Sequence, residues 1–369
     1  MTASGRTIEI AGRGIGPDFP PFVIAELSAN HAGDLNRALA MIEAAKEAGA
    51  DAAKLQTYRP DTITIDHDGP GFLVEEGLWA GRRLFELYEE AQTPWDWHET
   101  LFEKAKDVGI TLFSAPFDQT AVDLLESLNT PAYKIASFEI VDLPLVEYAA
   151  TTGKPLIIST GMASRQEIAE ALSTAKTAGA EGVALLHCIS GYPTPLSEAN
   201  LRMISELRQR FAVPVGLSDH THGLVAACAA VSLGASIVEK HFTLSRDKGL
   251  DAAFSLEPDE LKHLVRSCRE TWEALGEVAY GAAPSEAQSL KHRRSLYVVA
   301  DMAAGEVFTS ANLRSIRPGG GVSPKHLPDL LGRRAKVDIL KGTPMSWDLA
   351  EDPESRHLPS QAGTQRDSK

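Results

Sequence analysis

The chain has 369 residues, of which 43% are hydrophobic, and its formal net charge is −14 at pH 7. This composition predicts one large core and a small second domain, and the negative charge argues against binding to nucleic acids or anionic membranes. The three cysteines, Cys188, Cys228 and Cys268, are widely spaced and predict neither a disulfide framework nor a paired zinc motif. Together with the lack of an apolar signal segment or a membrane-length run, they favour a cytoplasmic protein.

Short apolar segments alternate with helical stretches between residues 22 and 275. Asp34 is expected to cap the first helix, and Ser164-Arg-Gln-Glu167 is a capping box that should open another. The alternation predicts a closed (β/α)8 TIM barrel. An open doubly wound sheet is the alternative, although no glycine-rich dinucleotide fingerprint follows the first strand. The expected strands are 22–27, 51–57, 110–115, 132–137, 155–160, 183–188, 214–219 and 236–242.

Residues 58–108 form a disproportionately long connection between the second and third strands. A long connection after a barrel strand lies at the catalytic face, so this segment is a candidate lid. Its second half should be a helix opened by Thr93 and Pro94.

The chain divides into a barrel at 1–282, a linker at 283–293, a small β-rich domain at 294–350 and a disordered tail at 351–369. In the small domain we expect a strand at 295–300, a short helix at 309–313 and a helical turn at 327–331.

Polar side chains gather where the predicted strands end, and in a TIM barrel these positions point into one pocket. Lysines and hydroxyls that converge there favour an anionic ligand that carries phosphate and carboxylate groups. The polar residues at the strand ends are Glu26, Lys54, Gln56, Ser114, Lys134, Ser137, Glu139, Ser159, Thr160, His187, Ser218, His220, Glu239, Lys240 and His241.

Two histidines end neighbouring parallel strands, because an alanine-rich helical stretch at 223–234 joins the strands that carry them. His220 and His241 should therefore emerge at the same end of the sheet, where they could hold a divalent metal. Glu26 could be a further ligand or could orient metal-bound water. Glu139 is a candidate general acid or base, or else an ion-pair partner of a nearby lysine.

Seven motifs, one at nearly every strand, resemble the sialic acid synthase family. They are Phe22-Val-Ile-Ala-Glu-Leu-Ser-Ala-Asn-His-Ala-Gly33, Lys54-Leu-Gln-Thr57, Lys134-Ile-Ala-Ser-Phe-Glu139, Ser159-Thr-Gly-Met162, His187-Cys-Ile-Ser-Gly-Tyr-Pro-Thr-Pro195, Gly216-Leu-Ser-Asp-His-Thr221 and Glu239-Lys-His-Phe-Thr-Leu244. The C-terminal part, whose core ends at Ser315-Ile-Arg-Pro-Gly319, resembles the antifreeze-like (SAF) domain attached to those enzymes. Within the family, residues 27–31 and 136–139 resemble the members that form pseudaminic acid.

The resemblance implies a transferase that condenses phosphoenolpyruvate with an N-acetylated aminosugar, giving a nine-carbon 2-keto acid and phosphate. The sugar that it favours is 2,4-diacetamido-2,4,6-trideoxy-L-altrose, with N-acetylneuraminate or legionaminate synthesis from N-acetylmannosamine or a related sugar as the alternative. Ser190 stands where neuraminate-forming members often carry Asn, and Ala115 replaces a common Thr beside Ser114.

The resemblance also implies a role for each matching residue. Phosphoenolpyruvate would be held by Lys54, Ser114, Lys134, Ser137, Ser159 and Ser218, and the sugar by Gln56, Glu139, Tyr192 and Asp251. His220 and His241 would bind Mn²⁺, with Mg²⁺ or Co²⁺ as alternatives, and Glu26 would position water. Arg317 would reach the sugar from a partner subunit, which implies a domain-swapped homodimer.

Three other functions stay open from the residues alone. A Schiff-base aldolase would use Lys54, Lys134 or Lys240 as its nucleophile. A metal-dependent hydrolase is less favoured, because this sequence lacks the additional histidines and carboxylates of a catalytic zinc site. A carbohydrate-binding or structural protein would leave the converging lysines without a purpose.

Overall fold

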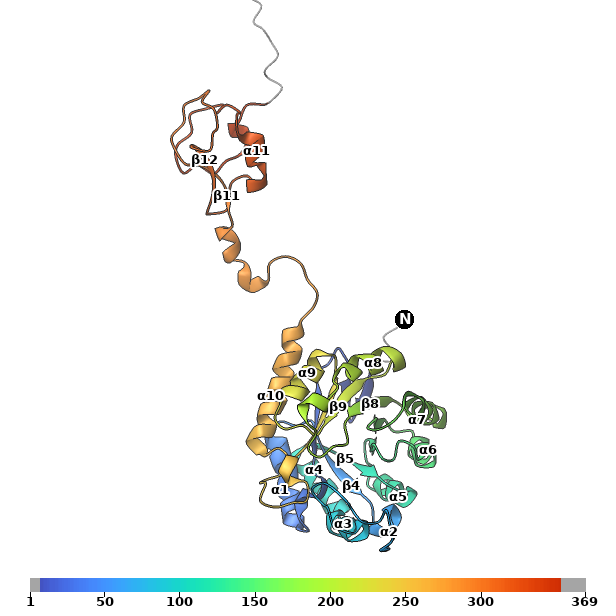
Figure 1. Cartoon of the computed structure of the whole chain (residues 1–369). Coiled ribbons are helices and arrows are strands. Elements are labelled where there is room, and N and C mark those ends of the chain that lie inside the picture. The colour runs from blue at the N-terminus through green and yellow to red at the C-terminus, as the bar shows by residue number, and fades with distance from the viewer. Residues whose placement is uncertain (1–6, 353–369) are drawn as a thin grey trace, which may run out of the picture. The chain divides into compact units, whose positions relative to one another are not determined.

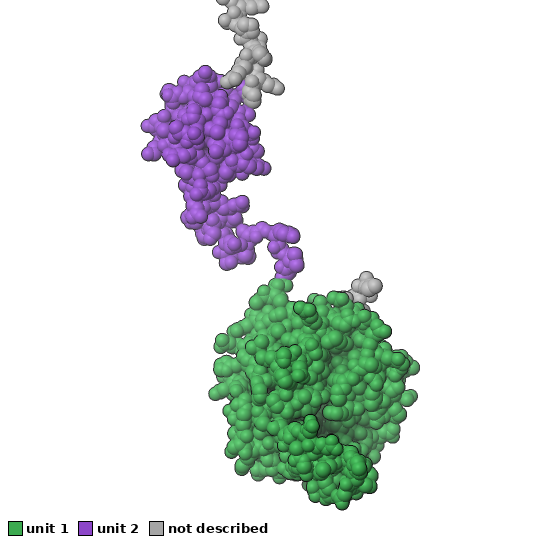
Figure 2. All heavy atoms as spheres, in the orientation of Figure 1, with its two compact units in different colours: residues 1–276 green, residues 277–369 purple. Residues whose placement is uncertain are grey.

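A computed structural model describes residues 7–352. The chain forms two compact units, residues 1–276 and residues 277–369 (Figure 2). The division into barrel, linker, small domain and tail proposed above stays a prediction at its boundaries, and residues 353–369 of the tail lie outside the described part. No helix among residues 7–352 is long and apolar enough to cross a membrane.

Unit 1 is a closed barrel of eight parallel strands, in the order β10-β3-β4-β5-β6-β7-β8-β9 (Figure 1). The predicted TIM barrel is therefore confirmed, and the open doubly wound sheet is excluded. The strands are β3 Phe22–Glu26, β4 Ala52–Thr57, β5 Thr111–Pro116, β6 Tyr133–Ile135, β7 Leu156–Ser159, β8 Val183–Cys188, β9 Val215–Asp219 and β10 Ile237–His241.

Helices surround the barrel and bury their apolar faces against the strands (Figure 1). Asp34 caps α1 and Ser164 caps α7 within a capping box, as the sequence predicts. The longer helices are α1 Leu35–Glu47, α4 His98–Val108, α5 Gln119–Ser127, α6 Leu143–Thr151, α7 Arg165–Ala178, α8 Arg202–Phe211, α9 Val225–Ser232 and α10 Pro258–Leu275.

A hairpin that the sequence analysis did not predict packs with the apolar layer inside the barrel. Its strands are β1 Ile8–Ile10 and β2 Arg13–Ile15, which pair antiparallel. Ile8, Ile10 and Ile15 join one buried cluster with inward-facing side chains of the barrel strands, among them Phe113 and Leu186. The lower part of the barrel interior is therefore an apolar core, and polar side chains begin above it.

The long connection after β4 contains α2 Pro60–Ile63, α3 Leu84–Ala91 and a 3-10 turn at Trp95–Trp97 before α4. The helix predicted in the second half of this connection is confirmed as α4, but it begins at His98. Pro94 caps the 3-10 turn that leads into α4, and Thr93 precedes that cap. The connection contacts the loops at the strand ends: the Trp79 indole nitrogen donates to the carbonyl of Leu250 at 3.3 Å.

Unit 2 has its own buried cluster, which includes Leu296, Phe308 and Leu313. Its elements are β11 Ser295–Val298, β12 Leu313–Ile316 and α11 Leu327–Leu330, with β11 and β12 antiparallel. The helical turn at 327–331 is confirmed, but the short helix predicted at 309–313 is wrong. Asn312 accepts from the Thr309 amide at 2.7 Å and donates to the Val307 carbonyl at 3.0 Å, which makes a turn that leads into β12.

Candidate active site

One inward-facing residue from each strand forms a layer directly above the apolar core of the barrel. Alternate residues of a strand face the same side, so each of these residues comes two positions after a residue that faces the apolar core. The layer consists of Glu26, Lys54, Ala115, Lys134, Ser159, Cys188, Ser218 and Glu239, all at most 4% exposed. The change from apolar to polar side chains, which occurs along most of the strands but not along β5, places charge in a deeply buried position.

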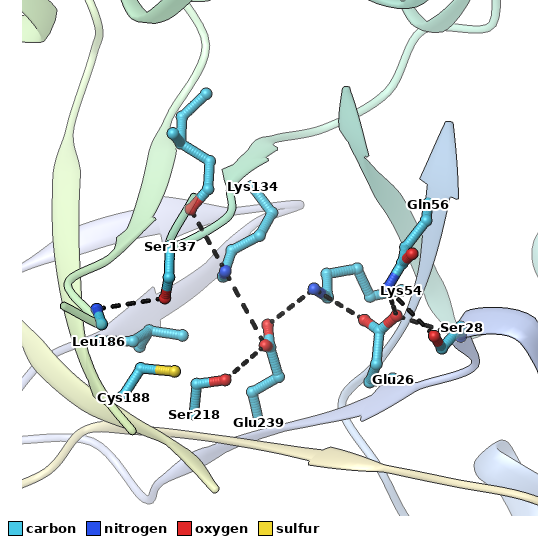
Figure 3. Close-up of polar contacts among 12 residues, drawn as sticks. Glu26, Ser28, Lys54, Gln56, Lys134, Ser137, Leu186, Cys188, Ser218 and Glu239 are labelled. Atoms are coloured by element: carbon cyan, nitrogen blue, oxygen red, sulfur yellow. Dashed lines mark hydrogen bonds and ion pairs between the residues drawn. The ribbon is translucent and has the colours of Figure 1, made fainter. Parts of the chain in front are cut away.

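Four charged groups of this layer contact one another (Figure 3). The Lys54 ammonium lies 2.7 Å from Glu26 Oε2 and 3.2 Å from Glu239 Oε2. The Lys134 ammonium lies 3.9 Å from Glu239 Oε1, and Ser218 Oγ donates to the same oxygen at 2.9 Å. Glu239 is therefore the central anion of the layer, a role that the sequence analysis did not assign to it.

The two carboxylates differ in their proton affinity. Burial raises the pKa of Glu239, but the charges of Lys134 and Lys54 outweigh it and bring the pKa to about 2. Burial also dominates at Glu26, where the opposing charge of Lys54 still leaves the pKa raised to about 7. Glu239 is therefore a permanent anion, whereas Glu26 can gain or lose a proton near neutral pH.

The two lysines differ as well. Burial lowers the pKa of Lys54, yet the charges of Glu239 and Glu26 raise it above its ordinary value. Burial lowers the pKa of Lys134, and Glu239 only partly opposes the change. Lys134 is the less neutralised cation, so it is the better placed of the two to receive an added anion.

A chain of hydrogen bonds extends from Glu26 toward the loop after β10. Gln56 Nε2 donates to Glu26 Oε1 at 3.2 Å and to Ser28 Oγ at 3.1 Å, and Ser28 Oγ donates to Asp251 Oδ2. Ser28 has a φ of +42°, a strained conformation for a residue with a side chain, which is common at functional sites. The sequence analysis includes Ser28 in the family motif at 22–33 but assigns it no role.

The two predicted histidines lie beside each other. The His220 and His241 ring centroids are 5.2 Å apart, and His220 Nδ1 lies 3.0 Å from the carbonyl oxygen of Ile189. His241 Nδ1 is buried without a hydrogen-bond partner among the described residues, with Asp251 Oδ2 at 3.7 Å. Burial, together with the charge of His220, lowers the pKa of His241 well below its ordinary value, so this imidazole is neutral.

Most of the remaining predicted residues of unit 1 lie in or beside the charged layer. Tyr192 packs against His220 with ring centroids 4.4 Å apart, and Ser137 Oγ accepts from the Gly161 amide at 3.1 Å. Ser159 Oγ and Glu139 Oε2 are buried without a hydrogen-bond partner among residues 7–352. Burial raises the pKa of Glu139 to about 7, although Lys134 lowers it.

Ser114 does not lie in the layer, and its expected place in the pocket needs correction. Phe113 faces the barrel interior, so the next residue faces the helices. Ser114 Oγ lies 2.6 Å from Thr57 Oγ1, which lies 2.8 Å from His98 Nε2 on α4. Alternation likewise turns two other strand-end residues outward: His187 Nε2 lies 2.8 Å from the Ala199 carbonyl oxygen, and Lys240 pairs with Asp219.

Comparison with known proteins identifies the family. Residues 41–280 match the NeuB family and residues 293–351 match the SAF domain. The chain is 45% identical to pseudaminic acid synthase of Campylobacter jejuni, covering 87% of this chain and 94% of that protein.

The chain belongs to the NeuB family.

The family expected from the strand motifs is thus confirmed, and two further relatives place the chain within it. It is 34% identical to N,N'-diacetyllegionaminic acid synthase of Legionella pneumophila, over 89% of this chain and 94% of that protein. A solved structure of N-acetylneuraminic acid (sialic acid) synthetase from Leptospira borgpetersenii, in complex with citrate, aligns with a TM-score of 0.69 at 34% identity, covering 78% of this chain and 95% of that chain. Identity is therefore higher to the pseudaminic acid synthase than to these two relatives.

Arg317 lies in unit 2, directly after β12, and is exposed. It is thus on a different unit of this NeuB-family chain from every other predicted site residue. Exposure leaves its guanidinium available to a second molecule, but the sugar-binding role of Arg317 stays a prediction.

Proposed function

We propose that this enzyme condenses phosphoenolpyruvate with 2,4-diacetamido-2,4,6-trideoxy-L-altrose, giving pseudaminic acid and phosphate. Membership of the NeuB family supports the reaction class, and the 45% identity to a pseudaminic acid synthase supports the choice of sugar. The 34% identity to the legionaminic acid synthase makes that product the weaker alternative. We also keep the cytoplasm as the proposed location.

The observation that carries the proposal is the pair of buried lysines inside the barrel. Lys54 and Lys134 lie on either side of Glu239, and Ser159 Oγ of the same layer has no partner among the described residues. A buried cation and a free hydroxyl are suited to a ligand that brings several anionic oxygens. Lys54, Lys134, Ser137, Ser159 and Ser218 are therefore the proposed site for the phosphate and carboxylate of phosphoenolpyruvate.

The donor set fits a divalent metal at the two histidines. His241 is a neutral imidazole with an unpartnered buried Nδ1, and the backbone contact of His220 is made through Nδ1, which leaves its Nε2 for a metal. No group of three or more His, Cys, Asp or Glu residues within residues 7–352 could hold an ion, so water and substrate would complete the coordination. Mn²⁺ is the preferred ion, with Mg²⁺ or Co²⁺ possible. When bound, the metal would polarise the aldehyde of the open-chain sugar.

The residues of the layer then account for the rest of the reaction. The lysines and serines hold the enol so that its terminal carbon faces the aldehyde carbon, and these two carbons form the new bond. Water adds to the carbon that carries the phosphate ester, and phosphate leaves with cleavage of the C–O bond. Glu26, with a pKa of about 7, orients that water and accepts its proton. Glu139, also near 7, is placed to exchange a proton on the sugar side.

Gln56, Tyr192 and Asp251 form the proposed sugar side of the site, because they continue the hydrogen-bond chain and the aromatic contacts outward from the layer. Arg317 completes this side from the partner subunit in the proposed domain-swapped homodimer. The aromatic contact between Trp79 and Tyr192, with centroids 6.1 Å apart, supports a covering role for the long connection after β4.

The direct test is phosphate release from phosphoenolpyruvate with Mn²⁺, with the altrose derivative and N-acetylmannosamine offered in parallel. We expect release with the altrose sugar alone and its loss with EDTA. Release with N-acetylmannosamine alone would keep the reaction and overturn the choice of sugar. Borohydride trapping tests the aldolase alternative. Burial lowers the pKa of Lys134 and of Lys240, but only Lys134 faces the barrel interior. An imine trapped on Lys134 would overturn the proposed mechanism.

A further inference from the structure

Behind the two histidines, on the outer side of the barrel wall, lies a fully buried ion pair that the proposed reaction does not use. Asp219 ends β9, Lys240 is the penultimate residue of β10, and the two residues are direct partners in the register of these strands. The Lys240 ammonium lies 2.7 Å from Asp219 Oδ2, and the two side chains are 0% and 1% exposed.

The pair is tied to the backbone on both sides of His220. Lys240 donates to the carbonyl oxygen of Thr221, and the Thr221 amide donates to Asp219 Oδ1 at 2.9 Å. The residues before and after His220 are thus both held by Lys240, which is itself the residue before His241. One ammonium group therefore joins the backbone segments that carry the two imidazoles.

Stability alone is a poor reason to keep this pair. Removing two charges from water costs several kcal/mol per ion, and an apolar pair of similar volume is often as stable or more stable. Neither group can contact substrate, because the inward positions beside them are occupied by Ser218 and Glu239. What this ion pair provides, and an apolar pair would not, is a donor and an acceptor that fix the backbone of Thr221, directly after His220.

We propose that Asp219 and Lys240 are positioning residues that set the separation of the His220 and His241 imidazoles from the outer side of the sheet, and so set the affinity of this site for a divalent cation. The inference rests on the proposed metal role of the histidines. The effect should be larger on the metal than on phosphoenolpyruvate, because the two lysines that hold phosphoenolpyruvate are on other strands, β4 and β6. Ser218 and Glu239 adjoin the pair on β9 and β10, but their side chains face the other side of the sheet.

The test measures Mn²⁺ binding to the full-length protein by calorimetry, together with the unfolding temperature and steady-state kinetics. The variants are Lys240→Met and the double variant Asp219→Leu with Lys240→Met, which replaces the ion pair by apolar groups. We expect the dissociation constant for Mn²⁺ to rise about 10- to 100-fold in both. The double variant should recover the unfolding temperature of the wild type without recovering Mn²⁺ affinity, and the KM for phosphoenolpyruvate should stay within about twofold.

Two controls separate the possible failures. Asp51 lies directly before β4 and pairs with Arg13 at 2.6 Å and with Arg269 at 3.2 Å. Asp51→Asn weakens these ion pairs and should lower the unfolding temperature while leaving Mn²⁺ affinity unchanged. His241→Ala tests the metal site itself: equal Mn²⁺ binding by this variant and the wild type would overturn the proposed metal role. If His241→Ala loses Mn²⁺ but the double variant binds it as the wild type does, the positioning role is wrong and the metal site stands.

Discussion

The Lys54 ammonium lies 2.7 Å from Glu26 Oε2, yet the pKa of Glu26 is raised to about 7 rather than lowered. A lysine in contact ordinarily lowers the pKa of a carboxyl group, so burial is the stronger effect here, and the negative charge of Glu239 adds to it. The lysine is shared between two carboxylates, and the one with the lower pKa, Glu239, keeps its charge. Glu26 is thereby left able to exchange a proton at the pH of a cell.

The first prediction follows from that pKa. The proposed base form of Glu26 is the carboxylate, so kcat should rise as pH increases through about 7. Glu26→Gln should lower kcat by about 100-fold and abolish this pH dependence, while Glu139→Gln, which removes the other carboxyl of similar pKa, should retain it. A pH step that persists in Glu26→Gln and vanishes in Glu139→Gln would reverse the two roles.

A second prediction concerns stability. The pKa of Glu239 falls from 4.5 to about 2 on folding, so its stabilising contribution is present above pH 4.5 and is lost as pH falls toward 2. Glu239→Gln should destabilise the protein at pH 7 by about 3–5 kcal/mol, because it leaves Lys134 without its only carboxylate contact among the described residues. Urea unfolding at pH 7 and pH 3 measures both effects; the difference between variant and wild type should shrink at pH 3. An equal difference at both values would contradict the assignment.

A third prediction separates two serines that look alike in the sequence. Ser159→Ala should raise the KM for phosphoenolpyruvate about tenfold, because its inward hydroxyl is free to bind a charged oxygen. Ser114→Ala should leave that KM within about twofold, because its hydroxyl bonds to Thr57 on the helix side. A larger effect of Ser114→Ala than of Ser159→Ala on the KM would mean that the geometry described above does not persist in the working enzyme.

A fourth prediction tests the partner subunit. Arg317→Ala should raise the KM for the sugar more than the KM for phosphoenolpyruvate; an equal rise in both would remove its assignment to the sugar. Complementation gives a sharper test. If Arg317 serves the site of the other subunit, refolding Arg317→Ala together with His241→Ala should yield mixed dimers with one intact site, whose KM for the sugar is that of the wild type. A mixture that forms dimers but keeps the raised KM of Arg317→Ala would mean that Arg317 serves the site of its own chain.

The sequence was sufficient for the strands and the reacting end of the barrel because buried parallel strands are short apolar runs whose ends all lie together. The sequence did not show which of two neighbouring residues at a strand end faces the barrel interior. Ser114, His187 and Lys240 all lie next to inward positions, and a shift of one residue moves a side chain to the other side of the wall. Counting by two from Phe113 would have assigned Ala115, not Ser114, to the site.

The pattern of apolar and polar residues could not reveal two other features, for different reasons. The hairpin of β1 and β2 has strands of only three residues, too short to show alternation. The turn at Thr309 resembles a helix start, since a threonine often caps a helix, but the side chain of Asn312 binds the Thr309 amide and closes a turn instead. In both cases contacts made by a few side chains decide the local structure, and periodicity does not report them.

The apolar cluster of Ile8, Ile10 and Ile15 with the lower barrel residues has a kinetic consequence. Because that end is filled, every substrate and product must pass through the one mouth at the strand ends. If the buried lysines hold phosphoenolpyruvate and the residues above them hold the sugar, as proposed, phosphoenolpyruvate is expected to bind before the aminosugar. The hairpin and the lower barrel side chains together close the end opposite the site.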